Sequence, residues 1–530
     1  MALSSVQEAN VLQLAEFHNQ ALTDFSSEQN RRAMEQALAK VRAELGREYD
    51  LIIGGERIRS DRKLKSYNPS KPAEVVGVFQ KATEPLVQKA VALAEAANQT
   101  WSQKAAEERV SLLLRLSRIM QERRLELAAW MIFEVGKSWT EADADVAEAI
   151  DFCEFYAREA LRLGRPQEVT RVAGEENNLY YIPLGVGVII PPWNFPLAIL
   201  TGMTTAAVVT GNTVIVKPSS DAPAIAGQLV EMMEQAGFPP GVVNFLTGSG
   251  AEVGDVLVTH PRVRFIAFTG SKEVGLRINE LAAKVPPGQI WIKRAILEMG
   301  GKDAIIVDSE TNLDEAAAGV VASAFGFQGQ KCSACSRAIV VEPVYDAFLD
   351  KLKHTVERTI EEGNVEDGGV NFGPVVNERA CQSILEYIEM GRKEGRVIAG
   401  GSRGSGEGYF IRPTVIADVD SKARIAQEEI FGPVLAVIKA RDYKQALEIA
   451  NDTQYGLTGA VYTDNQEKLA EAERKFHVGN LYLNRKCTGA LVGAHPFGGF
   501  NMSGTDSKAG GKDYLLLFTQ AKAISRKIKR

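Results

Sequence analysis

LGVGVIIPPWNFPLAILTGMTTAAVVTGNTVIV, residues 184–216, contains no charged side chain. An uncharged run of this length could be a transmembrane helix, but Pro191 and Pro196 interrupt it, and Gly202 and Gly211 interrupt it again. The β-branched runs at both ends and the alanine-containing run between them predict a buried strand, a tight turn, a buried helix and a second buried strand. The segment therefore predicts one βαβ unit of a parallel sheet.

The same alternation of short apolar runs and helical segments continues along the chain. VVNFLTG and VRFIAFTG follow the opening unit, with helices predicted near residues 222–236 and 251–259. A second set begins at about residue 303 with DAIIVD, SRAIVVE, PVLAVIKA, TGAVYT and GNLYLN. This rhythm predicts an α/β fold with two doubly wound domains.

The chain before this region is mainly helical. Residues 83–165 contain long amphipathic runs, and a helix is predicted over residues 26–46. Ser26 and Gln29 have the spacing of a capping box, and Gly46 is expected to end the helix. Its apolar face would be formed by Met34, Leu38, Val41 and Leu45.

Length, charge and cysteine content exclude several classes of protein. A chain of 530 residues is expected to form two large or three smaller domains. The net charge of −6 argues against a nucleic-acid partner, which usually requires a basic face. Five cysteines, sparse and odd in number, do not suggest a disulfide framework, and the first 17 residues lack the basic start and apolar core of a signal peptide. We therefore expect a cytoplasmic protein without membrane insertion.

Two segments have the character of exposed edge structure. Residues 166–185 are polar with a central glycine, which predicts an exposed hairpin, and the C-terminal residues alternate in part. Exposed edge strands pair readily with other strands. We therefore expect residues 166–185 and 501–530 to form an oligomerisation hairpin and C-terminal strand.

FQGQKCSACSR, residues 327–337, contains the most suggestive cysteines, Cys332 and Cys335. A structural zinc site would need two more soft ligands at similar spacing, and the chain has no second C-x-x-C, so no metal is expected. A thioredoxin-like redox pair would follow the first strand of a small βαβ domain. Two readings remain, a buried inert thiol and a nucleophile that small neighbours leave accessible.

Two other stretches could supply the partners of a nucleophile. ILEMGGKD places Glu298 among apolar neighbours, where a raised pKa would suit a general base. PPWNFP places Asn194 on a constrained turn after a strand, where its amide could stabilise an oxyanion. Each residue alone could equally be structural, but together they form a nucleophile, a base and an oxyanion donor.

Glycine-rich turns provide a weaker signal. FTGSKEVG and LTGSGAEVG each place glycines between a strand and a helix, where a helix N-terminus can bind phosphate. Neither has the usual G-x-G-x-x-G spacing, so dinucleotide binding stays open on this evidence alone.

The motifs together resemble the aldehyde dehydrogenase family. PWNFP, VKPS, FTGS, LEMGGK, GQKCSA, QEEIFGPV and PFGGF occur in the family's order, with 34 residues from Glu298 to Cys332. The resemblance extends from about residue 50 to the C-terminus. It implies an aldehyde dehydrogenase-like α/β fold with a Rossmann-type cofactor domain (residues 1–165 and 186–300, with the helical N-terminal extension), an α/β catalytic domain (residues 301–500) and a small β oligomerisation flap.

The resemblance also implies catalytic roles. Cys332 would attack the aldehyde carbon as a thiolate, and the Asn194 amide with the Cys332 backbone N–H would hold the oxyanion. Glu298 would activate the water that hydrolyses the thioester, which argues against relatives that use another acyl acceptor. Cys335 would be a bystander.

NAD is the implied cofactor. The position three residues after Lys217 is Ser220 here, where many relatives carry an acid that repels a 2′-phosphate, so NADP is expected to be tolerated. The residues that the resemblance places against the cofactor are Ile190, Pro192, Trp193, Lys217, Ser220, Gly270, Ser271, Gly275, Glu429 and Phe431.

The N-terminal extension and the stretch from Asn484 resemble one branch of the family, which oxidises L-glutamate γ-semialdehyde, formed from 1-pyrroline-5-carboxylate, to L-glutamate in proline catabolism. Arg485 and Lys486 are interpreted as solvated or structural, and Ala494-His495 departs from the Gln common in relatives. The residues implied for the substrate are Glu148, Phe195, Ser333, Gly489, Ala490 and Phe497.

Two other functions are compatible with parts of this pattern. A dehydrogenase of another acidic aldehyde, such as succinate semialdehyde, is disfavoured by the loop at Gly489. A non-catalytic protein on the same fold would be expected to lack Cys332, Glu298 or Asn194. The resemblance further implies a homo-oligomer built from dimers, which could assemble into a hexamer, and a separate proline dehydrogenase for the upstream step.

Overall fold

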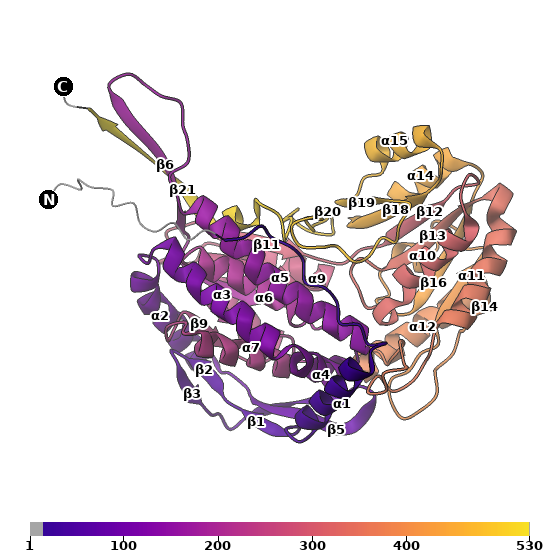
Figure 1. Cartoon of the computed structure of the whole chain (residues 1–530), viewed down its shortest axis with the longest axis horizontal. Coiled ribbons are helices and arrows are strands. Elements are labelled where there is room, and N and C mark those ends of the chain that lie inside the picture. The colour runs from indigo at the N-terminus through magenta and orange to yellow at the C-terminus, as the bar shows by residue number, and fades with distance from the viewer. Residues whose placement is uncertain (1–13, 529–530) are drawn as a thin grey trace.

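The computed structural model describes residues 14–528, which form two α/β lobes and a projecting ribbon (Figure 1). The interpretation of the N-terminus as lacking a signal peptide falls largely on residues 1–13, outside the described part. Within residues 14–528, no helix is long and apolar enough to cross a membrane.

The first lobe is built on a seven-stranded sheet in the order β11-β10-β7-β8-β9-β2-β3. Strands β7 to β11 are parallel, and β2 and β3 extend the sheet antiparallel. The strands are β2 (Leu51–Ile53), β3 (Glu56–Ile58), β7 (Val186–Ile190), β8 (Thr213–Val216), β9 (Val243–Phe245), β10 (Phe265–Thr269) and β11 (Arg294–Glu298).

Both faces of this sheet are covered. Val188 and Ile215 belong to one apolar core, and their neighbours Ile189 and Val216 belong to the other. This double burial explains why the opening stretch reads as an uncharged run rather than an alternating one. The helices of this lobe are α2 (Glu84–Trp101), α3 (Ala106–Glu122), α4 (Arg124–Val135), α5 (Trp139–Leu163), α6 (Ala198–Val209), α7 (Pro223–Ala236), α8 (Asp255–Thr259) and α9 (Lys272–Ala283).

The second lobe has its own seven-stranded sheet, in the order β14-β15-β16-β13-β12-β18-β19. All neighbouring strands are parallel except β14 and β15, and two further cores cover its faces. The strands are β12 (Asp303–Val307), β13 (Cys335–Val341), β14 (Arg396–Ala399), β15 (Thr414–Ala417), β16 (Val434–Ala440), β18 (Thr458–Tyr462) and β19 (Asn480–Leu483). The helices are α10 (Leu313–Phe325), α11 (Tyr345–Thr359), α12 (Glu378–Glu394), α13 (Arg424–Gln427), α14 (Tyr443–Asn451) and α15 (Gln466–Lys475).

The N-terminal extension forms helix α1 (Glu28–Arg42), which is shorter than predicted. Met34, Leu38 and Val41 are buried as expected. The predicted capping box is wrong, because the Ser26 hydroxyl donates to Asp24 and Ser27 is the N-cap. A small sheet follows, made of β1 (Arg47–Tyr49), β4 (Lys63–Asn68) and β5 (Lys71–Gln80).

The ribbon consists of β6 (Glu175–Pro183) and β21 (Thr519–Lys527), paired antiparallel along their whole length (Figure 1). The segment 166–185 therefore pairs mainly with the C-terminus, and the Gln167–Leu179 bridge is its internal pairing. Only part of residues 501–530 lies in the ribbon. The rest carries β20 (Phe500–Asn501), paired with β17 (Tyr455–Gly456), and a 3-10 turn, Tyr514–Phe518, whose Leu515 and Phe518 are buried in the first core.

Candidate active site

A cleft of about 1110 Å³ lies between the two lobes. Its walls come from the segments after β7, β8 and β10 in the first lobe and from the segment 427–431 and α12 in the second. Most of the cofactor and catalytic residues suggested by the sequence line it: Ile190, Pro192, Trp193, Asn194, Lys217, Ser220, Gly270, Ser271, Cys332, Glu429 and Phe431.

Parallel topology explains this convergence. Strands β7, β8 and β10 are neighbours in register, so their carboxyl ends meet at one edge of the sheet. Ligands of open α/β sheets bind at that edge. Ser271 caps α9 there by accepting a hydrogen bond from Val274 N (3.4 Å), which leaves the N-terminus of a 12-residue helix facing the cleft.

The cleft suits a dinucleotide. The N-terminus of α9 favours a diphosphate, and Lys217 places a buried ammonium on the same wall. Burial lowers the pKa of Lys217 to about 8. Lys217 Nζ donates to Pro218 O at 3.1 Å, so it retains donor capacity for a ribose hydroxyl.

Gly275 does not line the cleft. It lies one turn into α9, and a Cβ at this position would collide with the Met299 sulfur. The glycine therefore lets α9 pack closely on the segment after β11, and its role is to place the helix rather than to contact a ligand.

Ser220 lines the cleft, and so does its neighbour Asp221. The Asp221 carboxylate accepts a hydrogen bond from Asn377 Nδ2 at 3.0 Å, and burial raises the pKa of Asp221. Many relatives carry an acidic residue at the position of Ser220, and in this chain the acidic residue is Asp221, one position later. Its carboxylate is hydrogen-bonded to Asn377 of the second lobe.

Cys332 lies on the loop that joins α10 to β13. The loop begins with a 3-10 turn, Gly326–Gly329, in which Phe327 (φ 48°) and Gln328 (φ 56°) adopt left-handed backbone conformations. Asn194 Nδ2 donates to Gln330 O at 3.0 Å, so the amide predicted to hold an oxyanion is bonded to the nucleophile loop. The left-handed backbone conformations of Phe327 and Gln328 are strained, and such strain is typical of functional sites, where surrounding contacts enforce it.

The surroundings of the Cys332 thiol disfavour its ionised form. Burial raises its pKa far above the ordinary value, and the negative charges of Asp303, Glu429 and Glu298 raise it further. Attack by the sulfur therefore requires that its proton leave as the bond forms, or that positive charge enter the cleft first.

Glu298 is the last residue of β11, paired with Thr269 of β10. Glu298 is not among the residues that line the cleft. Its negative charge nevertheless raises the pKa of Cys332, so the two side chains interact electrostatically. Burial raises the pKa of Glu298 to about 7, against hydrogen bonds from Ser507. A carboxyl group with this pKa can act as a general base near neutral pH.

Cys335 is remote from this chemistry. It is the first residue of β13, it is buried in a core of the second lobe, and its sulfur donates to Arg337 O at 3.4 Å. Among residues 14–528, no cluster of three or more His, Cys, Asp or Glu side chains is arranged to hold a metal ion.

Residues suggested for the substrate lie around the same loop. The Ser333 carbonyl accepts from Thr458 Oγ1 (3.3 Å) and Cys487 Sγ (3.4 Å), which fixes the start of the segment 487–490, containing Gly489 and Ala490, next to the nucleophile. Arg485 stacks on Tyr482 (4.5 Å) and donates to Gly489 O (3.3 Å), so it shapes this segment.

Glu148, Phe195 and Phe497 come from three further elements. Glu148 lies on α5, and burial followed by the negative charge of Asp145 raises its pKa to about 8. Phe195 follows Asn194 in the turn before α6, and Phe497 pairs with Ala509 through backbone hydrogen bonds of 2.8 and 2.7 Å.

Sequence reasoning missed a buried cation beside these residues. Lys137 is fully buried, 3.0 Å from Asp145, and its ammonium lies 4.0 Å from the Phe195 ring centre and 4.6 Å from that of Phe327. Asp145 also accepts from Ala198 N at 2.6 Å, so the pair supports both the Asn194 turn and the nucleophile loop. A lone lysine in the otherwise apolar stretch before α5 was the available signal.

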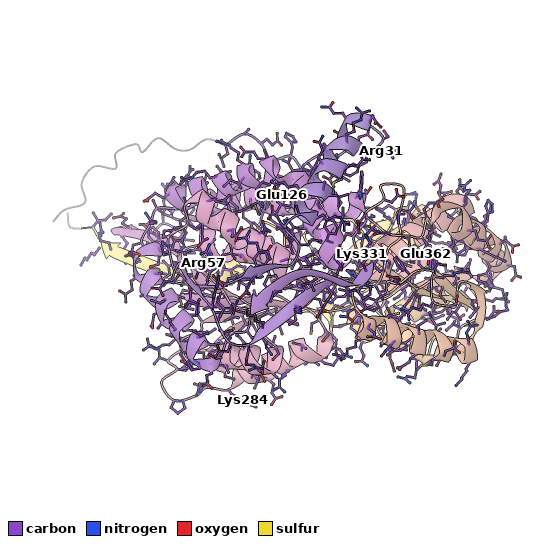
Figure 2. The ribbon with its side chains drawn as sticks, turned by 90° about the horizontal axis from the view of Figure 1, so that it is seen from below. Arg31, Arg57, Glu126, Lys284, Lys331 and Glu362 are labelled. Carbon is purple, nitrogen blue, oxygen red and sulfur yellow. The ribbon has the colours of Figure 1, made fainter. Side chains whose placement is uncertain are left out.

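Lys331, next to the nucleophile, was also missed. Its ammonium forms an ion pair with Glu141 of α5 (2.7 Å), and this pair joins the two lobes. Figure 2 shows Lys331 where the two lobes meet. Ser507 is the third missed residue, since its hydroxyl and amide both donate to the Glu298 carboxylate.

Comparison with known proteins finds close relatives over almost the whole chain. The sequence model of the aldehyde dehydrogenase family matches residues 57–524. A 1-pyrroline-5-carboxylate dehydrogenase of Geobacillus sp. (strain WCH70) is 56% identical over 509 residues, covering 96% of this chain and 99% of the relative.

Solved structures agree with the sequence comparison. A 1-pyrroline-5-carboxylate dehydrogenase from Thermus with bound NAD is 53% identical, with a TM-score of 0.96 over 97% of this chain and 100% of that chain. Proline utilization A (PutA) from Bdellovibrio bacteriovorus is 45% identical, with a TM-score of 0.95 over 97% of this chain and 54% of that chain.

Proposed function

Since this chain belongs to the aldehyde dehydrogenase family, we propose that it oxidises L-glutamate γ-semialdehyde, in equilibrium with 1-pyrroline-5-carboxylate, to L-glutamate. The observation that carries the proposal is the convergence of Cys332 and Asn194 on one cleft that suits a dinucleotide, together with Glu298, whose charge raises the pKa of the Cys332 thiol. The identity of 56% to a 1-pyrroline-5-carboxylate dehydrogenase supports the choice of substrate.

In the proposed mechanism, the Cys332 sulfur adds to the aldehyde carbon. The Asn194 amide and the Cys332 backbone N–H stabilise the resulting oxyanion, and each such donor is worth about 10²- to 10³-fold in rate. Loss of a hydride from this carbon would convert the adduct to a thioester, and bound NAD would supply the hydride acceptor. The residues that would hold NAD line the cleft: Ile190, Pro192, Trp193, Lys217, Ser271, Glu429 and Phe431.

Glu298 completes the cycle by removing a proton from the water that hydrolyses the thioester. Because a base acts only when deprotonated, deacylation should slow as the pH falls through about 7, the pKa of Glu298. On the substrate side, the N–H groups near Gly489 and Ala490 would bind the α-carboxylate, with Ser333 adding a hydroxyl. Glu148 would meet the α-ammonium, and Phe195 and Phe497 would pack on the aliphatic chain.

Steady-state kinetics test the substrate. NADH production from 1-pyrroline-5-carboxylate should exceed that from succinate semialdehyde by at least tenfold in kcat/KM, because only the former presents both an α-carboxylate and an α-ammonium. Equal or reversed values would assign the enzyme to another acidic aldehyde.

Cofactor choice is expected to depend on Ser220. Replacing Ser220 with glutamate should lower kcat/KM for NADP about 5- to 30-fold, because a carboxylate would repel the 2′-phosphate by roughly 1–2 kcal/mol. The value for NAD should change less than threefold, and Ser220→Gln serves as the uncharged control of the same size. Wild-type enzyme that shows no NADP turnover at saturating cofactor would contradict the expectation that NADP is tolerated.

We further propose that the ribbon joins copies of the chain into a dimer. Strand β19 is the open edge of the second sheet, beside a hollow of about 550 Å³, and the ribbon projects from the other lobe (Figure 1). Free strand edges favour pairing with a second chain. Such dimers could in turn assemble into a hexamer.

Deleting residues 519–530 should therefore convert the oligomer to a monomer, as measured by light scattering. The deletion removes β21 but leaves the cleft residues in place, so NAD binding should persist. An unchanged molar mass in the truncated protein would exclude the ribbon as the contact.

The upstream reaction must supply 1-pyrroline-5-carboxylate by oxidising proline. We propose a functional link to a proline dehydrogenase that performs it, since this chain is similar to part of a proline utilization A chain.

A further inference from the structure

The segment 501–508 wraps around the end of β11. Thr505 N donates to Leu297 O (2.9 Å), and Leu297 N donates to the Thr505 hydroxyl (3.0 Å). On the other side of Glu298, Met299 N donates to Ser503 O at 2.8 Å. The backbone on both sides of Glu298 is thus bonded to this segment, which leaves the carboxylate few ways to move.

Ser507 binds only one oxygen of that carboxylate. Its hydroxyl and its backbone N–H (3.4 Å) both donate to Glu298 Oε1. Glu298 Oε2 is buried and has no hydrogen-bond partner among residues 14–528. The two oxygens, chemically equal in a free carboxylate, are therefore unequal here.

Two glycines pack closely against the Glu298 carboxylate. A Cβ on Gly498 would lie 3.0 Å from Oε1, and a Cβ on Gly504 would lie 3.2 Å from Oε2. A larger side chain at either position would press on the carboxylate, so the close approach depends on glycine.

Ser507 lies between two residues with strained backbone conformations. Its neighbours Asp506 (φ 52°) and Lys508 (φ 51°) are both left-handed although neither is glycine. The Lys508 ammonium donates to Gly479 O and Gly498 O at 2.8 Å each, which anchors the strained turn. Strain persists where surrounding contacts over-determine it, commonly near functional groups.

We propose that Ser507 is a positioning residue for the base: it binds Oε1 of Glu298 and leaves Oε2 to take the proton from the deacylating water. This proposal rests on the role of Glu298 in the proposed function. In the step, a water O–H bond breaks and its proton goes to Oε2. The water oxygen forms a bond to the thioester carbon, and the C–S electron pair returns to the Cys332 sulfur.

The electrostatics agree with this arrangement. Burial raises the pKa of Glu298, whereas the Ser507 hydroxyl and amide, the Gly499 N–H and the Lys508 ammonium lower it. Cys332 and Tyr514 are the other titratable groups whose pKa responds to Glu298. Losing the Ser507 hydroxyl removes a donor to the ionised form, so the pKa of Glu298 should rise.

The pH dependence of kcat tests the proposal. Ser507→Ala should shift the acid limb upward by about one pH unit, which corresponds to 1.36 kcal/mol, because the variant loses a hydrogen bond to the ionised carboxylate. At pH 6.5 the variant should be several-fold slower than wild type, and at pH 9 the two should agree within about twofold. A general loss of structure would instead lower the rate at every pH.

A matched pair separates the hydroxyl from packing. Ser507→Thr should restore the wild-type profile, and Ser507→Val, which has the same shape without a donor, should behave like Ser507→Ala. Superimposable profiles for Thr and Val would overturn the proposal. Glu298→Gln tests the role of Glu298 on which this proposal rests: if the variant turns over at the wild-type rate, Glu298 is not the base, whatever Ser507 does.

Discussion

Cys332→Ala should reduce NADH production from 1-pyrroline-5-carboxylate at least about 10⁴-fold, because removing a catalytic nucleophile leaves only binding and oxyanion stabilisation. Neither neighbouring thiol lines the cleft, since Cys335 and Cys487 are both buried in a core of the second lobe. The measurement is the initial rate of absorbance change from NADH at saturating NAD.

Cys335→Ala is the matched control for this variant. It removes a thiol three residues away, and its activity should remain within about twofold of wild type once unfolding is shown to be unaffected. NAD binding by Cys332→Ala should also persist, because the walls of the cleft are otherwise unchanged. Equal rates in Cys332→Ala and wild type would remove the mechanism.

Glu298→Gln should separate the two half-reactions. Hydride transfer does not need the base that activates water, so each active site should release one NADH in a rapid burst. Deacylation should then fall by about 10²- to 10⁴-fold, the usual contribution of a general base. Glutamine keeps the size of the side chain and removes its basicity.

Stopped-flow absorbance measures this burst directly. A burst amplitude close to the active-site concentration, followed by a slow steady state, is the expected result. A variant with neither burst nor turnover would place Glu298 in the acylation step instead, and a variant with wild-type turnover would exclude it as the base.

The parallel, doubly wound sheet and the position of the cleft at its edge were predictable because the information is local. The uncharged run at 184–216 reports a strand buried on both faces, and parallel neighbours bring the ends of β7, β8 and β10 to one edge. Most of the cofactor residues that the family resemblance implied line the cleft at this edge.

Features that depend on distant partners were not predictable. Segment 166–185 looked like a hairpin because nothing local shows that β6 pairs with β21, more than 300 residues away. The capping box at Ser26 failed because Asp24 competes for the same hydroxyl at 2.6 Å. Ser507 looked like an ordinary loop residue until β11 placed Glu298 against it.

The central claim is that Cys332 carries the substrate as a thioester that Glu298 resolves. Glu298→Gln enzyme mixed with 1-pyrroline-5-carboxylate and NAD, quenched in acid and digested, tests it by mass spectrometry. The account predicts one γ-glutamyl group on the peptide that contains Cys332. A γ-glutamyl group on the peptide of another cysteine, or an unmodified Cys332 peptide after a full NADH burst, would contradict it.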